Sequence, residues 1–155
     1  ARPDRPGASA VHSHMTNTLN TPVEALEYAY PLLVTAYGVR RGSGGQGRAP
    51  GGDGLVREIR LLADADITLL SERRRQGPYG LEGGSPGAPG RNLVIQRGQA
   101  REMPGKFHAR LQAGDVVRVE TPGGGGYGKS CDAPCLAQGI QVENIYTTLQ
   151  QETDS

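Results

Sequence analysis

Two histidines near the start of the chain form the first group of residues whose types suit catalysis. His12 and His14 are separated by one residue, so an extended backbone places both imidazoles on one face. Such a pair could ligate a metal, or could combine one base with one orienting group. In the other interpretation both histidines bind backbone groups, while Asn17 and the threonines beside it organise a turn. We predict no metal site, because no third ligand is evident nearby.

A run of three arginines forms the second group. Arg73, Arg74 and Arg75 follow an expected strand and precede a glycine-rich loop. Guanidinium groups bind carboxylates through paired hydrogen bonds, so Arg73 and Arg74 are candidate substrate-binding residues that could clamp a small carboxylate. The alternative is that the run is a solvated stretch of charge.

The segment Gly123–Ser130 satisfies the phosphate-loop pattern G-x-x-x-x-G-K-[ST]. That loop must leave a buried parallel strand and enter a helix whose N-terminus faces the phosphates. The preceding residues Asp115–Glu120 alternate between apolar and polar, as in a half-exposed strand, and Pro134 would fall in the first turns of the required helix. Nucleotide binding at this loop therefore remains an alternative.

Composition limits the class of protein. The chain has 155 residues, 24 glycines, 11 prolines, no tryptophan and 35% hydrophobic residues, which indicates one loop-rich β domain or a piece of something larger. The net charge of +1 provides no field to recruit nucleic acid or an anionic membrane. No stretch approaches the roughly 18 apolar residues of a membrane span. We therefore expect neither nucleic acid nor a membrane as a partner.

The two cysteines and the first residue bear on location and origin. Cys131 and Cys135 lie four residues apart and supply only half of a structural zinc site. Isolated thiols suit a reducing compartment, so we predict a cytoplasmic protein. The sequence does not begin with methionine, and we expect a chain cut from a longer one.

The pattern of the chain predicts a mainly β protein with one short helix and long glycine-rich loops. Thr21 and Glu24 make a capping box with Pro22 at the first helical position, so the helix is expected from Pro22 to about Ala29. Glycines in the loops most simply supply positive φ angles, and close backbone approach to a ligand or partner is the alternative. The expected strands are Leu32–Arg41, Leu55–Leu62, Ile67–Arg73, Leu93–Ile95 and Val116–Val119, with Asp64–Asp66 as an acidic turn and Gly42–Gly54 and Gly77–Gly90 as long loops.

Composition changes abruptly after Gly128. All 15 arginines and 23 of the 24 glycines precede residue 129. We therefore divide the chain into residues 1–128 and a divergent tail, residues 129–155, which we expect to be poorly ordered.

Blocks in a fixed order resemble the C-terminal part of hydantoinase B subunits and the matching half of 5-oxoprolinases, over residues 11–128. The first blocks are His12–Thr18, Thr21–Glu24, Tyr30–Pro31, Arg41–Gly47 and Gly51–Glu58. The later ones are Ser71–Arg74, Gly77–Gly80, Gly83–Gly84, Gly114–Asp115 and the closing loop Thr121–Gly128. Family members usually follow that loop with aspartate and proline, where this chain has Lys129 and Ser130.

The resemblance implies a fragment of a larger α/β-type subunit that opens cyclic amides such as 5-oxoproline or hydantoins in an ATP-dependent reaction. Its implied partners are a hydantoinase A-like subunit, which would use ATP with Mg²⁺, and the N-terminal portion of the B-type chain. It places His12, His14 and Asn17 near the active site as candidate catalytic residues. We expect the fragment alone to bind no cofactor and to be inactive. Related members carboxylate ketones, so the substrate stays open, and a non-catalytic β scaffold for subunit assembly is a further alternative.

Overall fold

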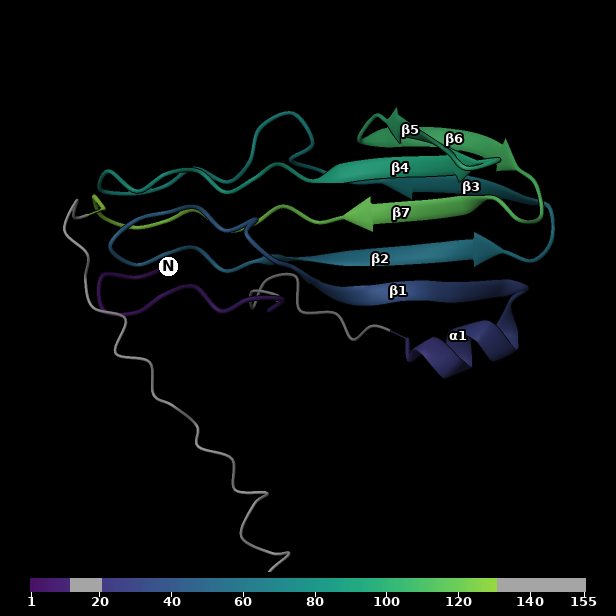
Figure 1. Cartoon of the computed structure of the whole chain (residues 1–155), viewed down its shortest axis with the longest axis horizontal. Helices are drawn as coiled ribbons and strands as arrows, with labels where there is room; N and C mark the ends of the chain where they lie inside the picture. The colour runs from purple at the N-terminus through teal and green to yellow at the C-terminus, as the bar shows by residue number, and fades with distance from the viewer. Residues whose placement is uncertain (12–20, 131–155) are drawn as a thin grey trace, which may run out of the picture.

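Seven strands and one short helix make up the regular structure of residues 1–11 and 21–130, the part of the chain that the computed structural model describes (Figure 1). The prediction of a mainly β chain with one short helix is confirmed. The division at residue 129 stays a prediction, since residues 131–155 lie outside the described part. The elements are α1 (Val23–Ala29), β1 (Leu32–Arg40), β2 (Gly54–Leu61), β3 (Ala65–Leu70), β4 (Arg91–Gln96), β5 (Gln99–Met103), β6 (Lys106–Leu111) and β7 (Val116–Glu120).

Helix α1 is where the sequence predicts it, but its start differs in detail. Pro22 is the N-cap residue and no side chain caps the helix, so the predicted capping box of Thr21 does not form. The helix ends at Tyr30, whose extended backbone precedes a proline. The carboxylate of Glu27 accepts the backbone N–H of Val34 at 2.7 Å. This bond ties the helix to strand β1.

The strands form two sheets. A five-stranded antiparallel sheet has the order β1-β2-β7-β4-β5, and β3 pairs with β6 in a separate two-stranded sheet. The strands β2 and β3 are thus consecutive in sequence but lie in different sheets. The predicted acidic turn Asp64–Asp66 is too long, because β3 begins at Ala65 and Asp66 is already inside it. The predicted strand Ile67–Arg73 ends earlier, at Leu70.

The core lies between the two sheets. The residues that pack there alternate along each strand, as expected when one face is buried. Strand β3 directs Ile67 and Leu69 toward the core, and β6 directs Phe107 and Ala109. The buried centre consists of Leu61, Val94, Leu111 and Val117. This small set of apolar residues holds the two-stranded sheet on the larger one.

The sequence pattern did not predict strands β5 and β6. A two-residue turn joins β4 to β5, and both of its residues, Arg97 and Gly98, have positive φ angles, 51° and 78°. Such hairpin turns favour Asn or Asp before the glycine, so the arginine conceals the signal. The β5 residues are mostly exposed and show no apolar alternation.

The long loops all leave one end of the five-stranded sheet. Strands β1 and β7 end there, and β2 and β4 begin there, because neighbouring strands are antiparallel. Beyond the strand ends the loops run side by side, with the N-terminal segment alongside them (Figure 1). We call residues 41–53, 77–90 and 121–128 the loop layer. It brings together segments that are far apart in the sequence.

Candidate functional site

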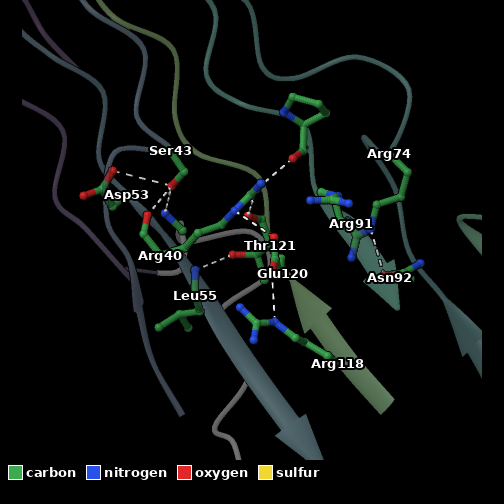
Figure 2. Close-up of polar contacts among 12 residues, drawn as sticks. Arg40, Ser43, Asp53, Leu55, Arg74, Arg91, Asn92, Arg118, Glu120 and Thr121 are labelled. Carbon is green, nitrogen blue, oxygen red and sulfur yellow. Dashed lines mark hydrogen bonds and ion pairs between the residues drawn. The ribbon is translucent and has the colours of Figure 1, made fainter. Parts of the chain in front are cut away.

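An arginine at the end of β1 holds the loop layer to the sheet. Arg40 donates through Nη1 to the carbonyl oxygens of Pro89, at 2.7 Å, and Thr121, at 3.2 Å. Its Nε pairs with Glu120 at 3.2 Å, and Arg118 binds the same carboxylate at 3.0 Å (Figure 2). The Glu120 side chain is buried, and a buried carboxylate is stable only when it is paired. The guanidinium of Arg40 therefore joins Glu120 of β7 to two of the three loop segments, residues 77–90 and 121–128.

A serine and an aspartate close the first loop. The buried Ser43 donates its hydroxyl to the Arg40 carbonyl at 2.7 Å and accepts the N–H of Gly54 at 2.8 Å. Asp53 accepts the N–H of Gly44 at 2.8 Å. That backbone hydrogen bond is the main cause that lowers the pKa of Asp53. The carboxylate therefore stays ionised at the mouth of the loop.

The glycines of the loop layer allow backbones to touch. Gly45 donates its N–H to the Gly124 carbonyl at 2.8 Å, and Gly124 donates to Gly52 at 2.8 Å. A Cβ added to Gly51 or Gly123 would fall 2.0 Å or 1.8 Å from a backbone oxygen of a neighbouring loop. Side chains are thus excluded by close packing.

The interpretation that these glycines mostly supply positive φ angles was wrong. Of the glycines in residues 42–54 only Gly42 has a positive φ, and of those in residues 77–90 only Gly83 does. Close backbone approach does occur, but it is to the neighbouring loops of this chain; the alternative of approach to a ligand or partner stays a prediction.

The loop Gly123–Ser130 lacks the geometry of a phosphate cradle. The preceding strand β7 is antiparallel to both of its neighbours. The N–H groups that would surround a phosphate donate to carbonyl groups of the other loops: this holds for Gly123, Gly124, Gly126, Tyr127 and Gly128. A donor already bonded inside the protein is not free for a ligand, so nucleotide binding at this loop does not fit.

A cleft opens between the loop layer and the N-terminal segment. It has a volume of about 730 Å³, and Asp53 and Arg73 are its charged side chains. Its remaining walls are mostly small or apolar residues from residues 1–11, the start of β2 and the loop that follows β7. We call it the Asp53 cleft. Val11 lies on its wall, one residue before the predicted His12.

The two arginines predicted to clamp a substrate differ in their contacts. Arg73 is exposed and lines the Asp53 cleft. Arg74 turns away, because its Nε donates to Asn92 at 3.0 Å and its Nη1 to the carbonyl of Glu72 at 2.6 Å. Burial lowers the pKa of Arg74, and the charge of Arg40 acts in the same direction. Only Arg73 lines the Asp53 cleft, so the two guanidinium groups do not clamp a ligand there, although both line a second cleft next to β3 and β6. A role of the pair in binding substrate stays a prediction.

The other predicted site residues, His12, His14 and Asn17, lie outside the described residues. Sequence reasoning missed Arg40, and it included Asp53 only within the loop Gly42–Gly54 and the family block Gly51–Glu58. The sequence did offer one indication that Asp53 has a structural role: it stands among glycines directly before a strand. Arg40 had no signal, because its partners are remote in the sequence.

The described residues hold no group of three or more His, Cys, Asp and Glu side chains that could bind a metal ion. Among these residues, no helix is long and apolar enough to cross a membrane.

This fold also forms part of much larger solved chains. An ATP-dependent caprolactamase from Pseudomonas jessenii matches with a TM-score of 0.61 and 29% identity, over 70% of this chain and 20% of that one. The nucleotide-free structure of an acetone carboxylase matches with a TM-score of 0.70 over 83% of this chain and 22% of that one. Its identity of 18% supports a shared fold only.

The chain belongs to the hydantoinase B/oxoprolinase family, whose sequence profile matches residues 1–130. 5-Oxoprolinase 1 of Arabidopsis thaliana is 44% identical over 131 residues, which are 84% of this chain and 10% of that protein. A protein of Pseudomonas sp. (strain NS671), named as the B-type component of a D-/L-hydantoinase, is 34% identical over 126 residues, 79% of this chain and 21% of that protein. This chain therefore spans between about a tenth and a fifth of the length of these relatives.

Proposed function

We propose that the chain is the C-terminal, β-rich part of a B-type subunit that opens cyclic amides in an ATP-dependent reaction. The family match over residues 1–130 carries this proposal. The names of the relatives and the likeness to a caprolactamase support a lactam or hydantoin ring as substrate. Ring opening breaks the amide C–N bond, with the hydroxyl of water going to the carbonyl carbon and its proton to the nitrogen.

In this proposal the chain builds one wall of the active site and does not act alone. The loop layer forms a closely packed face, and Val11 on the wall of the Asp53 cleft directly precedes the segment that holds His12, His14 and Asn17. A hydantoinase A-like subunit supplies the ATP chemistry, and the N-terminal portion of the B-type chain completes the site. The assembly works in the cytoplasm, a location that rests on the two isolated cysteines.

Arg73 is the proposed substrate-binding residue of this wall. It is exposed on the Asp53 cleft, whereas Arg74 is committed to Asn92. A free guanidinium suits the carboxylate of 5-oxoproline. We expect Arg73→Ala in the assembled enzyme to raise KM for 5-oxoproline with less effect on a ring that lacks a carboxylate.

The test is reconstitution. The chain, joined to the rest of its B-type polypeptide and expressed with an A-type subunit, should open 5-oxoproline, hydantoin or caprolactam only when ATP is present. The chain alone should open none of these rings. An assembled complex that converts none of these rings would refute the proposal. If the complex instead carboxylates acetone with ATP, the protein catalyses a different reaction from the one proposed.

A scaffold without catalytic residues is the second candidate. Large apolar side chains are exposed on and beside β1, including Tyr28, Leu33, Tyr37 and Val39, and such groups often mark contacts between subunits. Unchanged turnover after His12→Ala and His14→Ala in the assembled enzyme would favour the scaffold. Loss of turnover with intact assembly would favour the active-site wall.

A further inference from the structure

A second cleft is lined by basic side chains and by no acidic side chain. It lies where the chain leaves β3 and where β6 begins, has a volume of about 900 Å³, and is lined by Arg73, Arg74, Arg75 and Lys106 together with small or uncharged residues. No aspartate or glutamate is on its wall. We call it the basic cleft. Like charges held close together repel each other, so this wall favours a negatively charged occupant.

The cations of the basic cleft lack the acidic partners that three of the arginines in strands have. Arg40, Arg91 and Arg118 each pair with a glutamate. Within residues 1–11 and 21–130, Arg75 and Lys106 have no ion pair. Their donors therefore remain available to a ligand.

A buried asparagine positions this wall from behind. Asn92 is completely buried, and its amide donates to the Ser71 hydroxyl at 2.8 Å and to the Pro104 carbonyl at 3.0 Å. Its oxygen accepts the Nε of Arg74 at 3.0 Å. Ser71 in turn donates its backbone N–H to Gly105 at 2.8 Å. One side chain thus fixes the segment that carries the arginines to the turn that precedes Lys106.

The backbone of the arginine run is also held in an uncommon shape. Arg73 has a φ of 53°, a left-handed conformation that costs free energy for residues other than glycine. Its carbonyl accepts the N–H of Gly90 at 2.9 Å. The turn at Arg73 lets consecutive arginines diverge, so that Arg74 is anchored inside while Arg75 stays exposed.

We propose that the basic cleft binds a phosphate group. Guanidinium and ammonium groups are the side chains that recognise phosphate oxygens, and a phosphate carries more charge than a carboxylate to satisfy several cations at once. The source can be free phosphate or the phosphates of a nucleotide. The site is separate from the loop Gly123–Ser130, and it does not depend on the proposed ring-opening activity.

The experiment uses the whole chain and measures binding by calorimetry at constant ionic strength, with inorganic phosphate, pyrophosphate, ATP and acetate as probes. The test variant is Arg75→Ser with Lys106→Ser, which leaves the proposed substrate residue Arg73 in place. The control variant is Arg60→Ser with Arg101→Ser, which removes the same charge from exposed strand positions. Circular dichroism checks that both variants are folded.

We expect saturable binding of pyrophosphate by the native chain, at least tenfold weaker binding by the test variant, and less than a twofold change in the control. Tighter binding of ATP than of pyrophosphate would assign the site to a nucleotide, and the reverse would assign it to free phosphate. No saturable binding of any phosphate, acetate bound as tightly as phosphate, or equal losses in both variants would overturn the proposal. None of these outcomes depends on turnover, so this proposal and the ring-opening proposal can fail separately.

Discussion

The core and the loop layer are stabilised in opposite ways. Between the sheets, apolar side chains such as Leu61, Val94 and Val117 are buried and fill the space. In the loop layer, by contrast, backbones touch one another because glycines have no side chains, and hydrogen bonds between loops replace apolar packing. Removing side-chain volume should therefore destabilise the core, whereas adding side-chain volume should destabilise the loop layer.

The largest effect is expected from adding one methyl group to the loop layer. Gly123→Ala would place a Cβ 1.8 Å from the carbonyl oxygen of Ser43, so the loops must separate. We expect a loss of about 4 kcal/mol in the free energy of unfolding, measured with urea. The control is Gly38→Ala in β1, where a Cβ meets nothing within 4 Å; it should be neutral or stabilising by about 0.5 kcal/mol. Equal losses in both variants would contradict the role of close packing.

Removing volume from the core should have the next largest effect. Leu61→Ala leaves a cavity between the two sheets, because Leu61 is only 4% exposed. We expect it to destabilise the chain by about 3 kcal/mol. Its neighbour Leu62 is 57% exposed, and Leu62→Ala should change stability by less than about 0.5 kcal/mol. Similar values for the two variants would mean that the core lies elsewhere.

The third prediction concerns Arg40, which connects the five-stranded sheet to the loop layer. Arg40→Met removes two carbonyl contacts and one of the two partners of the buried Glu120, and we expect a loss of about 2 kcal/mol. Hydrogen exchange should also rise at the loop amides of Gly45 and Gly124. Arg91→Met breaks the exposed pair with Glu102 and should have a much smaller effect. Unchanged exchange in Arg40→Met would show that the loops hold together without the sheet.

The smallest effect is expected for the dependence of stability on pH. The pKa of Asp53 is lowered in the folded chain from its ordinary value of 3.8, so its contribution to stability is present above that value and is lost as pH falls through the folded pKa. Asp53→Asn lacks this contribution. The native chain should therefore have the higher Tm at pH 6, and the difference should shrink toward pH 3. A difference that stays constant over this range would rule out the ionised carboxylate as its cause.

The site was predictable only in part. The blocks Arg41–Gly47 and Thr121–Gly128 were recognised from sequence, and the family they indicated is confirmed. Arg73 and Arg74 are adjacent in sequence, yet only Arg73 lines the Asp53 cleft, because the backbone has a positive φ at Arg73 and Arg74 donates to Asn92. Adjacent positions do not fix where side chains point once the backbone turns.

The sequence by itself determined the local elements: the alternation in β1, the helix α1 that ends before Pro31, and the glycine-rich composition of the loops. These follow from side-chain periodicity and backbone sterics over a few residues. Only the tertiary structure decided that β3 leaves the large sheet to pair with β6, and that Arg40 reaches Thr121 across 81 positions in the sequence. Such contacts form between segments that are distant in the chain, and no local pattern encodes which distant backbone a glycine will touch.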